Sequence, residues 1–124
     1  MAEKQEKILY IGTHANDDPE RACLPFVLGN AALAMDVQAL VILQLNGVFL
    51  AKKGFVDNMP LAGGFPPLKK LMADFLELGG EIRVCMPCIK ERNIAEADLI
   101  EGAATTAGGA LNLAAMEANA VLVF

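Results

Sequence analysis

The sequence predicts an α/β fold, a three-layer α/β/α sandwich with a mainly parallel sheet of about five strands, in a single domain of residues 1–124. Apolar runs alternate along the chain with segments of helical periodicity, which is the pattern of strand–helix–strand units. Almost every position in these runs is apolar, as expected for parallel strands buried on both faces. The length of 124 residues also matches one ordinary domain.

The first third of the chain is predicted to form strand, helix and strand. Residues 7–12 and 37–43 are the strands, and the helix occupies 17–35. Asp18 is a favourable N-cap residue, and Pro25 inside the helix is expected to kink it. The inward face of this helix is expected to hold Leu24, Val27, Leu28, Ala31 and Met35.

The remainder is predicted to continue the same alternation. Residues 67–80 form an amphipathic helix that ends at Gly79 or Gly80. Its inward face is expected to hold Leu68, Leu71, Met72 and Phe75. The other expected elements are a helical turn at 48–54, a loop at 55–67, a strand at 81–86, a helical turn with a brief strand at 93–103, a helix at 106–118 and a strand at 120–124.

Composition argues against two classes of partner. A net charge of −5 disfavours nucleic acid, because phosphate binding requires a basic surface. No run of about 18 apolar residues could cross a membrane, and the charged start MAEKQEK does not resemble a signal peptide. Three cysteines, an odd number, suit a reducing compartment, so we expect a cytoplasmic protein.

The apolar content predicts a homo-oligomer. Residues of the apolar classes make up 55% of the chain, whereas charged residues make up 20%. A small domain has too much surface to bury so much apolar material alone. We therefore expect part of it to be buried between identical subunits.

Polar and reactive side chains follow three of the predicted strands. The first strand leads to His14, the second to Asn46, and the third to Cys85 and Cys88. Because ligand sites in open parallel sheets lie beyond the carboxyl ends of the strands, this edge is the candidate functional site.

The segment VCMPCIKER, residues 84–92, places Cys85 and Cys88 in CxxC spacing. A cysteine reacts as the thiolate, and its ordinary pKa is about 8.5. A helical turn starting at residue 86, together with Lys90 and Arg92, is expected to lower the pKa of Cys85. The alternative is that both thiols are small core residues, which is the role we assign to Cys23.

A metal site is an alternative that we do not favour. His14, Cys85 and Cys88 supply three ligands, whereas a structural zinc site needs four, and no second CxxC or HxxxH is present. His14, the only histidine, is equally compatible with a site residue and a structural one.

Four segments in order, DDPERACLPFVLGNAALAM, LNGVFLAKKG, VCMPCIKERNI and DLIEGA, resemble the DsrE/DsrF-like family, which includes the sulfur-relay subunits DsrE and TusD and the YchN-like proteins. The resemblance implies a three-layer α/β/α fold and assembly into trimers or hexamers. It places Cys85 at the position that carries a persulfide in the relay subunits and Arg92 in the basic stretch that follows. Cys88 has no counterpart in TusD-like subunits, although other members have a CxPC arrangement.

These observations leave three hypotheses. The first is a sulfur carrier or sulfurtransferase that holds a persulfide on Cys85, with Cys88 as auxiliary thiol and His14, Arg92 and Asn46 as stabilising or binding residues. It needs no cofactor, but it needs sulfur donor and acceptor proteins. The second is a redox dithiol formed by the CxxC pair. The third is a non-enzymatic oligomer that binds a metal or small ligand at the strand ends, so whether the protein is an enzyme stays open.

Overall fold

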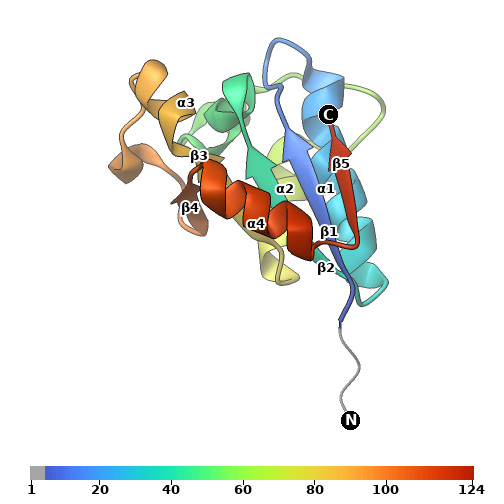
Figure 1. Ribbon diagram of the computed structural model, residues 1–124. Coiled ribbons are helices and arrows are strands. Elements are labelled where there is room, and N and C mark those ends of the chain that lie inside the picture. Colours follow the sequence, from blue (N-terminus) through green and yellow to red (C-terminus); the bar gives the residue numbers. More distant parts are fainter. Residues whose placement is uncertain (1–4) are drawn as a thin grey trace.

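The computed structural model describes residues 5–124, which form a five-stranded sheet with every strand pairing parallel (Figure 1). Residues 1–4, part of the charged start, lie outside the described residues. The strands are β1 (Lys7–Gly12), β2 (Gln38–Leu43), β3 (Glu81–Cys85), β4 (Ala103–Thr106) and β5 (Ala120–Val123). Their order in the sheet is β4-β3-β2-β1-β5.

Helices lie on both faces of the sheet, which confirms the predicted three-layer α/β/α fold. Helices α1 and α2 cover one face and α4 crosses the other (Figure 1). The α-helices are α1 (Pro19–Ala34), α2 (Leu68–Glu77), α3 (Met86–Glu91) and α4 (Gly108–Glu117). The 3-10 helices are η1 (Leu45–Ala51), η2 (Phe55–Asn58) and η3 (Glu96–Asp98).

The central strands send side chains into two separate cores. Tyr10, Val41 and Val84 belong to the large core under α1 and α2. A small core on the other face contains Leu9, Ile11, Leu40 and Ile42, which pack against Leu111 and three alanines of α4 and the residues that follow it. Because successive strand residues point to opposite faces, burial on both sides explains the nearly unbroken apolar runs.

Helix α1 begins as predicted but buries a different face. Asp18 caps it by accepting a hydrogen bond from the backbone N–H of Arg21. The predicted inward face is wrong for Ala31 and Met35, which are exposed, whereas Leu24, Val27 and Leu28 are partly buried, and the last two pack against the large core. The residues actually buried are Ala22, Cys23, Pro25, Phe26, Gly29 and Ala32.

Contact with α2 explains this choice of face. Apolar residues surround α1, so periodicity alone cannot select one side. Gly29 lets the ring of Phe75 approach so closely that a Cβ at position 29 would lie 2.7 Å from it. Phe26 and Phe75 pack edge to face with ring centroids 5.5 Å apart. The space at Gly29 therefore orients α1 toward α2.

Helix α2 confirms the prediction in detail. Its four predicted inward residues are all buried. Gly79, with φ 98°, donates to the carbonyl of Leu76, and Gly80 donates to that of Phe75. This pair of bonds is the Schellman arrangement, which ends a helix at a glycine in the left-handed region.

The connecting segments differ from their predicted boundaries. Helix η1 spans Leu45–Ala51 instead of 48–54, and η2 lies inside the predicted loop 55–67. The brief strand expected within 93–103 is β4, which begins only at Ala103. Short elements of this kind are set by contacts with the sheet, so local composition places them poorly.

Candidate functional site

The two cysteines of the CxxC segment meet at the carboxyl end of β3. Cys85 is the last residue of β3, and α3 begins immediately afterwards, with a proline in its first turn. The turn brings the Sγ atoms of Cys85 and Cys88 to 2.9 Å from each other. Both thiols are free and partly buried. The structure thus brings together the two thiols that the sequence predicted as a pair.

A side chain of η1 and the residue that caps the end of α3 join beside the thiols. The Arg92 guanidinium donates from Nε and Nη2 to Oδ1 of Asn46, each at 3.2 Å. Its Nη1 donates to the backbone carbonyl of Cys88 at 3.1 Å. Arg92 therefore connects the segment after β2 to the helix after β3, and Asn46 and Arg92 lie next to the cysteine pair.

A backbone donor completes this cluster. The N–H of Leu45 donates to Sγ of Cys88 at 3.2 Å. The start of η1 is in turn fixed against β1, because the backbone N–H of Gln44 donates to the carbonyl of Gly12 at 2.9 Å. A Cβ at Gly47 would lie 2.2 Å from that same carbonyl oxygen, so only glycine fits there. Leu45 could not be predicted as a site residue from its side chain, because it takes part through its main-chain N–H.

The expected activation of Cys85 is not present. Burial raises the pKa of Cys85 above its ordinary value, and the neighbouring Cys88 thiol raises it further. The N–H of Cys88 and the charge of Arg92 act to lower it, but burial dominates. The helical turn and Arg92 thus act in the predicted direction, but the predicted net lowering of the Cys85 pKa is wrong for the reduced dithiol, because burial and the Cys88 thiol outweigh them.

His14 lies just after β1, and its partner is Asp17, not one of the cysteines. Its Nδ1 contacts Oδ2 of Asp17 at 2.6 Å, and the N–H of Ala15 donates to Oδ1 of Asp17 at 2.7 Å. Burial acts to raise the pKa of Asp17, but the Ala15 and His14 hydrogen bonds lower it overall. The pairing of His14 with Asp17 was not predicted, although the HxxD spacing of residues 14 and 17 is visible in the chain.

The alternative metal set is not assembled. Among residues 5–124, no group of three or more His, Cys, Asp or Glu side chains is arranged to hold a metal ion. The combination of His14, Cys85 and Cys88 therefore does not form one ligand set. The strand order is the physical reason, because β2 separates β1 from β3.

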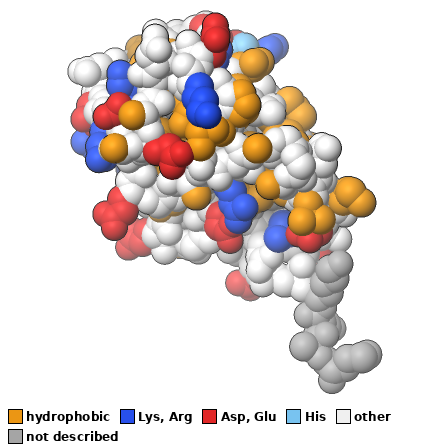
Figure 2. All heavy atoms as spheres, turned by 60° about the vertical axis from the view of Figure 1, so that its left-hand side comes forward, with side chains coloured by type: hydrophobic (Ala, Val, Ile, Leu, Met, Phe, Trp, Pro, Cys, Tyr) orange, Lys and Arg blue, Asp and Glu red, His pale blue; other side chains and the backbone are white. Residues whose placement is uncertain are grey.

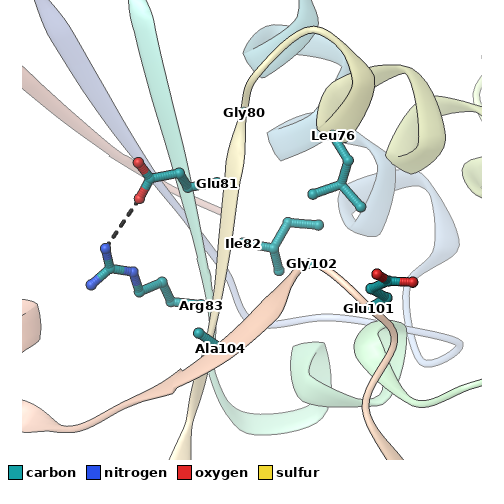
Figure 3. A pocket seen from close by; sticks show the side chains of 8 residues that line it. All are labelled: Leu76, Gly80, Glu81, Ile82, Arg83, Glu101, Gly102 and Ala104. Atoms are coloured by element: carbon teal, nitrogen blue, oxygen red, sulfur yellow. Dashed lines mark hydrogen bonds and ion pairs between the residues drawn. The ribbon is translucent and has the colours of Figure 1, made fainter.

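A surface pocket of about 600 Å³ lies at the opposite end of the sheet (Figure 3). It is lined by residues at the starts of β3 and β4, including Ile82 and Ala104. Figure 3 shows Glu81 and Arg83 on one side of β3, joined by an ion pair of 3.1 Å, and Leu76 on the other. None of the predicted site residues lines this pocket.

The described surface exposes several large apolar side chains. On the side of the molecule where α3 and β4 lie, apolar side chains emerge between charged ones (Figure 2). On α4 and β5, the exposed fractions are 56% for Leu113, 83% for Met116 and 63% for Val123. Within residues 5–124, no helix combines the length and apolar character needed to cross a membrane.

Comparison with known proteins identifies relatives of the whole fold. The profile of the DsrE/DsrF-like family matches residues 6–124. The chain is 36% identical over 97 residues to the uncharacterized protein MJ0989 of Methanocaldococcus jannaschii, covering 78% of this chain and 81% of that relative. It is 32% identical over 99 residues to the uncharacterized protein MJ0760 of the same organism, covering 80% of this chain but only 36% of the relative.

A solved structure has the same fold. The chain superposes on the crystal structure of the ychN protein from E. coli with a TM-score of 0.80, covering 97% of this chain and all of that one. The sequence identity is 18%, so this likeness concerns the fold.

Proposed function

Because the chain belongs to the DsrE/DsrF-like family, we propose that it carries sulfane sulfur as a persulfide on Cys85. The observation that supports this proposal is the pair of free thiols at the carboxyl end of β3, with Sγ atoms 2.9 Å apart. A thiolate can accept the outer sulfur of a donor persulfide, and the persulfide formed can give that sulfur to an acceptor thiol. Each step exchanges one sulfur–sulfur bond for another, and no cofactor is required.

The neighbouring residues have proposed roles that follow from their contacts. Arg92 and Asn46 hold η1 against α3 beside the thiols, and the charge of Arg92 favours an anionic sulfur. His14, held by Asp17 at the end of β1, is proposed to bind the sulfur donor or acceptor at the same edge. The free thiols suit a reducing compartment, so the cytoplasm is the proposed location.

The carrier function can be tested by loading and delivery of sulfur. The reduced protein is exposed to polysulfide, or to thiosulfate and a rhodanese, and then mixed with an acceptor dithiol. Intact-mass spectrometry is expected to show the gain of one sulfur atom and its loss to the acceptor. Cys85→Ser should abolish delivery, whereas Cys23→Ala, which removes the buried thiol of α1, should not. Delivery at the wild-type rate by Cys85→Ser would refute the role of Cys85.

The sulfur–sulfur distance also favours a second candidate, a dithiol that cycles to a disulfide. A disulfide bond is about 2.05 Å long, so the two Sγ atoms need to approach by less than about 1 Å. Mild oxidation should then remove two of the three free thiols, and titration against a glutathione buffer should give a reduction potential within the cellular range. A protein that keeps all three thiols under these conditions is not a redox dithiol.

We also propose that the protein is a homo-oligomer, either a trimer or a hexamer. The apolar side chains exposed on α4 and β5 support this assembly, together with the 55% apolar content of the chain. Subunits that cover these side chains would remove from water the apolar surface that one chain leaves exposed.

A further inference from the structure

The two thiols of the pair have different surroundings. Sγ of Cys88 accepts a hydrogen bond from the N–H of Leu45 at 3.2 Å. Such a bond strengthens when the sulfur becomes negative, because charge-assisted hydrogen bonds are about twice as strong as neutral ones. For Cys85, burial and the Cys88 thiol raise the pKa and outweigh the N–H of Cys88 and the charge of Arg92, which act to lower it. The Leu45 N–H therefore favours a negative charge on the sulfur of Cys88.

The backbone that supplies this donor is held in an unfavourable conformation. Leu45 has φ 51°, which places a residue with a side chain in the left-handed region. Its side chain is 55% exposed, so side-chain packing does not account for the conformation. The following residue, Asn46, is fixed by two hydrogen bonds from Arg92. Strain of this kind persists where the surroundings fix the backbone, and here it aims an N–H at a sulfur.

We propose that Cys88 receives the sulfur from the donor and then passes it to Cys85, with the Leu45 N–H as the positioning group. This inference rests on the proposed carrier function and assigns an order to its two thiols. It reverses the order expected from sequence, in which Cys85 reacts first and Cys88 is auxiliary.

The two transfers balance without an oxidant or reductant. In the first, the Cys88 thiolate attacks the outer sulfur of a donor persulfide, a sulfur–sulfur bond forms at Cys88, and the donor leaves as a thiol that takes up a proton. In the second, Cys85 attacks that same sulfur, the bond to Cys88 breaks, and the proton of Cys85 passes to Cys88. The distance of 2.9 Å between the Sγ atoms places Cys85 within reach of a sulfur bound to Cys88.

The first experiment measures which thiol is more nucleophilic, without any sulfur donor. The reduced protein is treated with a substoichiometric amount of iodoacetamide and digested with trypsin, which leaves both cysteines on the peptide of residues 84–90. Fragmentation before Pro87 separates Cys85 from Cys88. We expect about tenfold more label on Cys88, which is the effect of a hydrogen bond to a charged group. Equal labelling, or more label on Cys85, would overturn the inference.

The second experiment follows sulfur in a single turnover from polysulfide. Cys85→Ser is expected to load at nearly the wild-type rate and to retain the sulfur on Cys88, whereas Cys88→Ser should load about tenfold more slowly. Fast loading of Cys88→Ser, with none on Cys85→Ser, would refute the order but leave the carrier function intact. If the wild type takes up no sulfur, the carrier function fails, and the two-step transfer fails with it.

The third experiment tests the Leu45 N–H. Leu45→Gly keeps the N–H and accepts a positive φ, so the ratio of Cys88 to Cys85 labelling should not change. Gly47→Ala should displace η1, because the added Cβ would lie 2.2 Å from the carbonyl oxygen of Gly12, and the labelling ratio should fall severalfold toward one. Thermal unfolding checks that this variant is folded. An unchanged ratio in folded Gly47→Ala would contradict the positioning role.

Discussion

Tyr10, Cys23 and Cys85 are three acids whose pKa values are raised by burial. For Cys23, burial acts first and the charge of Glu20 second. For Cys85, burial is followed by the Cys88 thiol. A group with a raised pKa binds its proton more tightly in the folded state than in the unfolded state. Its contribution to stability is complete below the unfolded pKa and is lost as the pH rises through the folded pKa.

The raised pKa values predict that the folded protein loses stability at alkaline pH. The free energy of unfolding should decline as the pH rises above about 8.5, the ordinary pKa of a cysteine. The thiols of Cys23 and Cys85 lose their protons there in the unfolded chain, whereas burial keeps them protonated in the folded one. Urea denaturation at a series of alkaline pH values measures this decline. Cys23→Ala should show a shallower decline than the wild type, and an identical slope would mean that Cys23 does not contribute.

Arg92 contributes a positive charge beside Cys85. Its charge acts to lower the pKa of Cys85 against burial and Cys88, so Arg92→Gln should raise that pKa further. Alkylation of Cys85 in a Cys88→Ser background should become about two- to fivefold slower near neutral pH, the effect of one partly screened charge. Lys90→Gln is the matched control, because the same charge is lost from an exposed side chain only two residues away, on α3. If both substitutions slow the alkylation of Cys85 equally, its rate depends on the net charge of the protein and not on the position of Arg92.

At the scale of elements, the packing of α1 on α2 depends on one small residue. Gly29 leaves room for the Phe75 ring, which also packs against Phe26. The interface therefore has a defined contact point that hydrophobic periodicity alone did not reveal.

Gly29→Ala should destabilise the protein by about 1–2 kcal/mol. Overpacking typically costs about 1–3 kcal/mol, and the gain in helix propensity offsets up to about 1 kcal/mol of it. Gly109→Ala in α4 makes the same chemical change where nothing lies within 4 Å, so it should be neutral or stabilising. Urea denaturation of both variants measures the difference. Equal stabilities would show that α1 and α2 can move apart without cost.

At the scale of the whole molecule, the two faces of the sheet are covered unequally. Helices α1 and α2 bury one face in a large core, whereas α4 alone covers the other and has no buried residue. Strand β5 also has exposed residues at all four positions. Five of the nine exposed large apolar side chains among the described residues lie on α4 and β5.

The proposed homo-oligomer should depend on this side. Met116→Glu introduces a charge at a side chain that is 83% exposed, and we expect it to dissociate the assembly or weaken it at least about tenfold. Sedimentation velocity or light scattering measures the mass. Met35→Glu, at an exposed position at the end of α1, is the control and should leave the mass unchanged. Assembly that survives Met116→Glu would place the interface elsewhere.

Local sequence patterns were sufficient to predict the order of the strands and main helices, the parallel sheet and the CxxC pair at the end of a strand. These features depend on residues that are close in the sequence: apolar runs predict buried strands, a capping residue marks the start of a helix, and Gly79 marks the end of α2. Leu68, Leu71, Met72 and Phe75 were correctly predicted as buried because α2 is apolar on only one side.

Which face α1 buries and which thiol accepts the Leu45 N–H depend on contacts between residues that are far apart in the chain. Helix α1 is apolar on several sides, so the choice was made by the space that Gly29 leaves for Phe75. Leu45 and Cys88 are 43 residues apart in the chain. A hydrogen bond from a main-chain N–H does not depend on the type of residue that supplies it, so the sequence gives no sign of this contact. Desolvation of Cys85 likewise depends on what surrounds it in three dimensions, and for that reason charge and spacing alone predicted the wrong direction for its pKa.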